Sequence, residues 1–158
     1  IFVTRLGVWN QDTQFGMEGL TSNHRIGIWN VDTGTLLVEG VAGPGGTVIG
    51  AFTYSEVAQT LLTVGNNYVI GALYNEGGIE DGDSYISGAS SITMDSAINF
   101  GGGTFPTVEN LGFAMPASWS GGTSNGRFGP NFTFVPVPAP GAVAVLGLGG
   151  LVASRRRR

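Results

Sequence analysis

The last 24 residues of this sequence constrain the chain most, because they divide it into two parts of different chemistry. Prolines 136, 138 and 140 alternate with small apolar residues, an uncharged apolar run follows over residues 141–153, and four arginines come last. Proline lacks an N–H and fixes φ, so a helix can begin only after the prolines. Four adjacent guanidinium groups do not enter hydrocarbon and stay cytoplasmic under the positive-inside rule. We therefore expect an exported body over residues 1–134 and a membrane-anchoring tail over residues 135–158.

The apolar run is short for a membrane span. Thirteen residues at about 1.5 Å each make roughly 20 Å of helix, against a hydrocarbon core of about 30 Å. Four glycines at 141, 147, 149 and 150 weaken a helix further. The alternative is a buried helix with a basic end. However, soluble domains seldom finish with four like charges that follow a helix without a polar face.

The order of prolines, hydrophobic helix and arginine cluster resembles the PEP-CTERM sorting signal of exported bacterial proteins. The residues that match its elements are Pro136, Pro138, Ala139, Pro140, Arg155, Arg156, Arg157 and Arg158. The family's central Pro-Glu-Pro is replaced here by Pro-Ala-Pro. The resemblance implies an exosortase-type processing enzyme as partner. It also implies an inner-membrane anchored precursor and a final location at the cell surface or outside the cell.

The charge balance separates the body from the tail. Residues 1–154 contain three arginines against eleven carboxylates, a net charge of −8. Because nucleic-acid affinity comes largely from neutralising phosphates, this balance argues against a nucleic-acid partner. The chain has no cysteine, which excludes disulfides and thiol chemistry. It starts at Ile1 inside an expected strand, without Met or a leader, so we expect the N-terminus of the protein to be missing.

A nine-residue pattern occurs twice, at residues 5–13 (the first copy) and 25–33 (the second copy). Six positions are identical (Arg, Gly, Trp, Asn, Asp and Thr) and two exchange one aliphatic residue for another. In a strand, alternate side chains point to opposite faces. The aliphatic side chains then belong to the core face, while Arg5 and Trp9, and likewise Arg25 and Trp29, lie on the other face. Two copies are too few for a solenoid, so we interpret them as two similar strands.

The Arg/Gly/Trp faces admit two interpretations. Trp9 and Trp29, backed by Arg5 and Arg25, could stack against a sugar ring as the binding site of a polysaccharide. Alternatively, both indoles cover the second side of a sandwich core while the arginines extend to its rim. The spacing of the residues does not decide between these interpretations.

The rest of the body consists of short apolar runs separated by Gly, Asn, Ser and Pro. A turn at residues 32–35 predicts a hairpin into residues 36–42, and a turn at 65–67 leads into residues 68–74, an apolar run that predicts a central strand. No helix is indicated before the tail. We predict an all-β fold, an antiparallel β-sandwich of Ig-like or jelly-roll-like type, followed by the C-terminal hydrophobic helix.

Residues 6–74 also resemble a domain of uncharacterised function found in proteins with the same C-terminal signal. The resemblance rests on Leu-Gly-Val-Trp at residues 6–9, His-Arg-Ile-Gly-Ile-Trp at 24–29, Gly-Thr-Leu-Leu at 34–37 and Gly-Asn-Asn-Tyr-Val-Ile-Gly-Ala at 65–72. It implies an all-β extracellular domain and provides no catalytic residues to transfer.

Carboxylates gather in one loop, residues 75–84. Calcium prefers several oxygen ligands on a flexible loop, so the candidate ligands are Glu76, Glu80, Asp81 and Asp83. The spacing does not match the EF-hand loop, and a solvated acidic loop is the alternative. No other cofactor is indicated.

Catalysis has little support in the sequence. His24 is the single histidine, and a lone histidine just before a strand is expected to be structural or solvated. No Gly-x-Ser-x-Gly elbow is present. A Ser-His-Asp triad would require a serine and an acid beside His24 in a cleft. We expect a non-enzymatic surface or matrix protein that acts in adhesion or biofilm formation. The alternative is a carbohydrate-binding or adhesion module.

Overall fold

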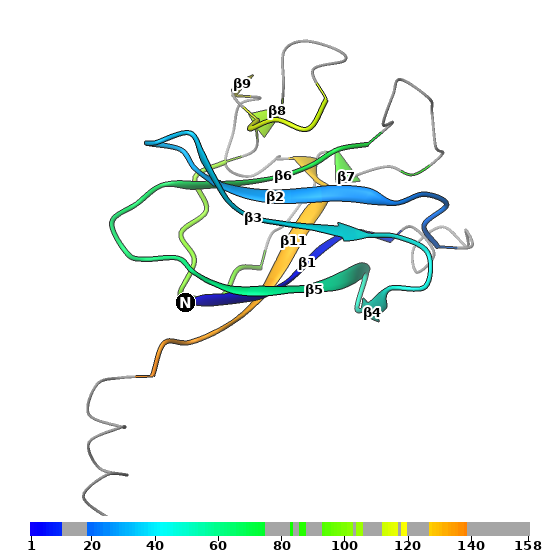
Figure 1. Ribbon diagram of the computed structural model, residues 1–158, viewed down its shortest axis with the longest axis horizontal. Helices are drawn as coiled ribbons and strands as arrows, with labels where there is room; N and C mark the ends of the chain where they lie inside the picture. Colours follow the sequence, from blue (N-terminus) through cyan, green and yellow to red (C-terminus); the bar gives the residue numbers. More distant parts are fainter. Residues whose placement is uncertain are drawn as a thin grey trace, which may run out of the picture.

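The computed structural model describes residues 1–10, 19–74, 83, 86–87, 93–102, 104–105, 112–116, 118–119 and 127–138. These residues form strands and turns and contain no helix. The two largest sheets are antiparallel and lie over one another as two layers (Figure 1). The predicted all-β class is therefore confirmed. The predicted C-terminal helix lies outside the described residues.

The lower layer in Figure 1, sheet A, has the strand order β11-β1-β5-β4. Its strands are β1 (Phe2–Trp9), β4 (Thr47–Ile49), β5 (Phe52–Leu61) and β11 (Pro130–Val135). β1 is an inner strand, and its register shifts between Val3 and Arg5 against both neighbours. Strict alternation would put Val3 and Leu6 on opposite faces. The irregularity inserts one residue between them, so both side chains are fully buried.

The upper layer, sheet B, has the order β3-β2-β6. Its strands are β2 (His24–Asn30), β3 (Thr35–Ala42) and β6 (Tyr68–Ala72). The predicted hairpin joins β2 to β3 through Gly34, whose φ of 68° suits glycine. The prediction of a central strand at residues 68–74 is wrong for the described sheet, where β6 is an edge strand. The run is apolar because both of its faces are covered: Ile70 packs on the core, and Pro116 lies against Gly71 on the other side.

The remaining strands extend this framework. Residues 52–61 form one continuous strand, β5, and the glycine-rich segment before it contains the short strand β4. Two small antiparallel ladders join β7 (Ile86–Ser87) to β10 (Arg127–Phe128), and β8 (Thr104–Phe105) to β9 (Ser118–Trp119).

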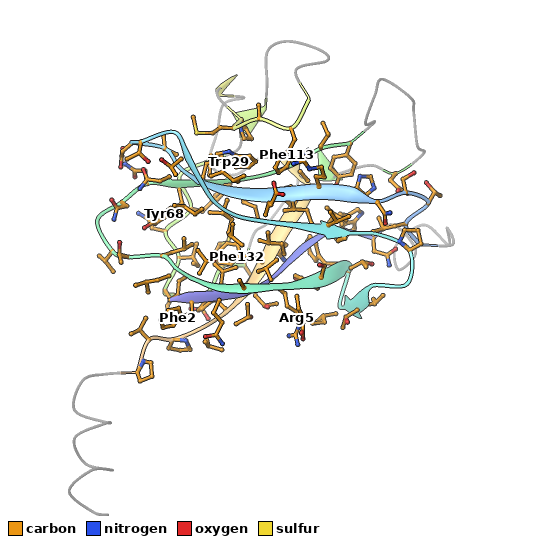
Figure 2. The ribbon with its side chains drawn as sticks, in the orientation of Figure 1. Phe2, Arg5, Trp29, Tyr68, Phe113 and Phe132 are labelled. Atoms are coloured by element: carbon orange, nitrogen blue, oxygen red, sulfur yellow. The ribbon has the colours of Figure 1, made fainter. Side chains whose placement is uncertain are left out.

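The hydrophobic core lies between the two sheets. Its buried members come from both layers and from adjoining loops: Val3, Leu6, Val8, Leu20, Ile26, Ile28, Val38, Ala42 and Leu62. Figure 2 shows Phe132 and Tyr68 in the same space, and both pack against this cluster. The aliphatic side chains of both copies therefore face inward, as strand alternation predicts. Each copy supplies the inner strand of its own sheet, β1 in sheet A and β2 in sheet B.

The chain leaves the body at the end of β11. Val135 pairs with Phe2 at the start of β1, and residues 136–138 then run on without strand structure and exposed to solvent. Figure 1 shows this segment leaving sheet A beside the first residue of the chain. Among the described residues, no helix is long and apolar enough to cross a membrane.

Candidate functional site

The predicted binding residues lie on the outward faces of two different sheets. Arg5 and Trp9 belong to β1 of sheet A, whereas Arg25 and Trp29 belong to β2 of sheet B. Because the aliphatic sides of β1 and β2 face one another across the core, the Arg/Gly/Trp sides point away from each other. Each arginine therefore lies on the same face of its sheet as the tryptophan of its own copy, and the two tryptophans lie on different sheets.

On sheet A, the outward face is covered by neighbours from β5. Arg5 forms an ion pair with Glu56, 3.1 Å between Nη2 and Oε1. The ring of Tyr54 lies against Gly7, where an added Cβ would meet its Cδ1 at 2.5 Å. Burial raises the pKa of the Tyr54 hydroxyl above its ordinary value. Trp9 packs edge-on against Phe52 of β5, with 5.4 Å between ring centroids. This layer leaves Trp9 only 8% exposed.

On sheet B, part of the cover comes from outside the sheet. Residues 112–116 place Phe113 beside Trp29, with 5.1 Å between ring centroids, as Figure 2 shows. The guanidinium of Arg25 lies over the Phe113 ring, 4.2 Å from its centroid. Arg25 also pairs with Glu39 of β3 at 3.1 Å. Trp29 is 5% exposed, so its faces are occupied by the protein itself.

These contacts decide what the two faces can do in this structure. A stacking site for a sugar needs an open aromatic face on the surface. Both indoles are buried on opposite sides of the molecule, so they form no shared platform. The geometry agrees with the alternative interpretation, in which the indoles cover each sheet and the arginines lie at the rim, with side chains 36% and 39% exposed.

The most highly connected polar group of the described residues is centred on His24 and Asp83. His24 Nε2 lies 2.8 Å from Asp83 Oδ2, and the side chains are 0% and 5% exposed. The carboxylate also accepts hydrogen bonds from the backbone N–H groups of Thr21 and Ser22, at 2.9 to 3.0 Å. On the other side of the ring, Nδ1 lies 3.2 Å from the carbonyl oxygen of Leu73. We call this group the His24–Asp83 clasp.

The electrostatics of the clasp favour an ionised carboxylate. Burial by itself raises the pKa of Asp83. The hydrogen bonds from Thr21, His24 and Ser22, together with the charge of His24, lower this pKa by more than burial raises it, so the net shift is downward. An ionised carboxylate and a carbonyl only accept hydrogen bonds. The two ring nitrogens of His24 therefore face two acceptors, and a doubly protonated imidazole would make its contact with Asp83 a buried ion pair.

This arrangement is built to hold chain segments together. The described partners of the two ring nitrogens are a carboxylate and a carbonyl, and Ser22 contributes its backbone N–H to Asp83. A Ser-His-Asp triad needs a hydroxyl on the ring and an open side for substrate, whereas the His24 side chain is fully buried. Of the two expected roles of His24, structural or solvated, these contacts agree with the structural one. The clasp joins β2 and residues 21–22 to Asp83 and Leu73.

Of the four predicted calcium ligands, only Asp83 is among the described residues. Glu76, Glu80 and Asp81 lie outside them, and Asp83 accepts hydrogen bonds through both of its carboxylate oxygens. Within the part of the chain that the structure describes, no group of three or more His, Cys, Asp or Glu side chains could hold a metal ion. The side chain of Asp83 is buried.

The sorting-signal residues are described in part. Pro136 and Pro138 are exposed and continue from β11, whereas Ala139, Pro140 and the arginines at 155–158 lie outside the described residues. Sequence reasoning did not identify the partner of His24 or the role of Phe113. One signal was available: His24 precedes the second copy where Thr4 precedes the first. No periodicity marks Asp83 or Phe113, because each comes from a segment far away in the sequence.

Comparison with known proteins identifies no relative: no family model, no curated protein and no solved structure matches this chain. The function is therefore argued from the residues of the chain and their arrangement.

Proposed function

We propose that this chain is an exported cell-surface or extracellular-matrix protein without catalytic activity, retained and processed through a PEP-CTERM-like sorting signal. Before processing, the tail anchors the precursor in the inner membrane, and an exosortase-type enzyme then acts near the prolines. The observation that carries the proposal is the order of the three blocks in the tail: alternating prolines, an uncharged apolar run over residues 141–153, and arginines at 155–158.

The way in which the tail leaves the body supports this proposal. A processing enzyme needs an accessible, extended segment. Residues 136–138 are exposed, and they follow directly from the end of β11. Proline at 136 and 138 removes backbone donors, which keeps the segment from joining a sheet. A membrane anchor attached at this point holds the body by the edge of sheet A.

The finer fold belongs to the same proposal. We interpret the two sheets as a β-sandwich of Ig-like or jelly-roll-like type. Along the chain, β1 lies in sheet A, β2 and β3 lie in sheet B, β4 and β5 lie in sheet A, β6 lies in sheet B, and β11 lies in sheet A. Repeated crossing between two antiparallel layers is typical of such sandwiches, which are frequent in cell-surface proteins. The acidic charge of the body suits a protein that stays soluble outside the cell.

Two observations favour a non-enzymatic surface protein over the alternatives. The buried His24 is held by Asp83 and Leu73, which leaves the ring no open side for a substrate. The carbohydrate-binding alternative requires exposed indoles, whereas Trp9 and Trp29 are covered by Phe52 and Phe113.

Cell fractionation combined with intact-mass analysis tests the proposal. In cells that produce the chain, we expect the protein in the membrane fraction first, and then at the surface with a mass that lacks the tail. Replacing the arginines at 155–158 with glutamine removes the charges that keep the end of the chain from crossing the membrane, so retention in the membrane is lost. Arg5→Gln is the matched control, because it removes an arginine from the body and leaves the tail intact. A mature protein in the cytosol that keeps all four terminal arginines would overturn the proposal.

A further inference from the structure

Apolar side chains gather at one end of sheet A, four of them exposed and one, Phe2, half-buried. Phe2 of β1 pairs with Leu61 of β5 on one side and with Val135 of β11 on the other, and paired residues share a face. Leu61 is 46% exposed and Val135 is 43% exposed. Val64, in the turn after β5, is fully exposed, and Val137, beyond β11, is 48% exposed. We call these five residues the apolar row.

The segments that carry the row contain no charged side chain. Residues 1–4, 57–67 and 130–138 contain no Asp, Glu, Lys or Arg side chain, although the chain has eleven carboxylates. The nearest ion pair along β1 is Arg5–Glu56. A solvent-facing surface on an acidic body would ordinarily carry charged side chains at such exposed positions. The row itself is therefore uncharged, although Asp32 lies beside the loop that follows Val64, where it accepts hydrogen bonds from Asn67.

The apolar row is also the end from which the tail departs. Val135 and Val137 belong to the row and to the chain that leads out, and Figure 2 shows Phe2 beside that exit. Gly141, the start of the apolar run, lies six positions after Val135, and six extended residues span at most roughly 20 Å. With the run in a membrane, the row cannot lie farther than this from the hydrocarbon boundary.

From this geometry we infer that the apolar row is a membrane-contact surface, which rests against the interface of the bilayer that holds the tail. The inference rests on the proposed function and adds an orientation to it. The end of sheet A that contains Phe2 contacts the lipid, and β4 lies at the end of the sheet that is remote from the membrane. The contact is apolar, because the row has no cation to attract anionic lipid headgroups and the acidic body is repelled by them. Its expected partner is therefore a lipid surface that carries no net charge.

Lipid quenching of a single label tests the inference on the full chain. The protein has no cysteine, so one label can be placed by Leu61→Cys in the row or by Val48→Cys on β4. Val48 is 55% exposed, lies in the same sheet and is remote from the exit, which makes it the matched control. Each variant is reconstituted through its tail into phosphatidylcholine vesicles that contain a quencher at the headgroup end of the acyl chains.

The expected result is severalfold stronger quenching at position 61 than at position 48, unchanged in high salt, and its loss when Phe2 and Val135 are both replaced by asparagine. Equal quenching at both positions, with the chain retained in the vesicles, would refute the membrane contact and leave the anchor intact. Disulfide formation between two unlabelled Leu61→Cys chains would also refute the membrane contact, because it would show that the row binds a second copy of the chain. A chain that is not retained in the vesicles at all would refute both the anchor and the contact.

Discussion

The two copies of the nine-residue pattern have the same position in the fold and different surroundings. Both form the inner strand of a sheet, turn aliphatic side chains to the core and pair their arginine with a glutamate on an adjacent strand. They differ at the residue before the copy. The hydroxyl of Thr4 lies 2.9 Å from that of Thr133 in β11, whereas His24 Nε2 lies 2.8 Å from the buried carboxylate of Asp83.

They also differ in what covers their outward faces. The first copy is covered by its neighbour strand, through Tyr54 and Phe52 of β5. The second is covered by Phe113 and Pro116, which belong to neither neighbouring strand. The repeated pattern therefore specifies the core-facing side chains of each copy and its position as an inner strand of a sheet. The outward face is specified by whichever distant residues reach it.

The largest difference between the copies is expected from their preceding residues. Asp83→Asn removes the charge that balances His24 and weakens the acceptor for two backbone N–H groups. We expect a loss of about 3 kcal/mol in the free energy of unfolding, the order seen when one partner of a buried ion pair is removed. The equivalent change at the first copy, Thr133→Val, removes one partly buried hydroxyl contact and is expected to cost about 1 kcal/mol.

Urea unfolding of both variants checks this prediction. Circular dichroism before unfolding establishes that each variant has kept its strands. If Asp83→Asn costs no more than Thr133→Val, the clasp is not the stronger of the two links.

The glycines at the centre of each copy give the second comparison. At Gly7, an added Cβ meets the Tyr54 ring at 2.5 Å and the backbone oxygen of Thr53 at 2.8 Å; at Gly27, it meets the ends of three side chains. Backbone cannot move aside, so we expect Gly7→Ala to cost roughly 2–3 kcal/mol and Gly27→Ala about 1 kcal/mol. Thermal unfolding measures both. Gly101→Ala, which meets nothing within 4 Å, is the control with little effect. A larger loss at Gly27 would show that its side-chain neighbours are the more rigid.

The pH dependence of stability separates the clasp from the threonine contact. The pKa of Asp83 is lower in the folded state than its ordinary value of 3.8, so the unfolded state binds more protons as acid is added. The contribution of Asp83 is complete above pH 3.8 and is lost as the pH falls through the lowered folded value. Acid titration of unfolding is expected to show a decline that Asp83→Asn reduces and Thr133→Val keeps. Equal declines in the two variants would contradict this role of Asp83.

The smallest effects are expected from the two arginine–glutamate pairs. Both are solvent-exposed, so double-mutant cycles on Arg5 with Glu56 and on Arg25 with Glu39 should each give less than about 1 kcal/mol, falling further in high salt. Arg25→Ala is expected to cost more than Arg5→Ala because it also removes the stacking on Phe113. Repeating Arg25→Ala in a Phe113→Leu background removes that excess if the stacking causes it.

The inward half of the fold could be predicted from the sequence because it depends on local alternation. Leu6, Val8, Ile26 and Ile28 are placed on the core face by strand geometry alone, and the hairpin after the second copy follows from Asp, Thr and Gly in its turn. The edge position of β6 was not predictable from its apolar run. A strand covered on both faces has the same composition whether or not it also has two neighbours.

The candidate site was much less predictable. The sequence identified Trp9, Trp29 and the arginines as special, yet gave no sign of what would cover them, since Phe113 reaches Trp29 across 84 positions of sequence. His24 was expected to be structural or solvated, and its burial agrees with the structural role. Its partner Asp83 appeared in the sequence as one of several loop carboxylates. Residues that meet through tertiary structure have no fixed spacing from which their contact could be read.

The pairing of β1 with β11 sets the order in which this domain can be completed. Thr4 and Thr133 are 129 positions apart. β1, which lies between β11 and β5, therefore cannot pair with its second neighbour until nearly the whole body has been synthesised. Until then its unpaired edge is open to pairing with other chains, and closing so long a loop makes folding slow. Such a domain needs protection from aggregation until its final strand arrives.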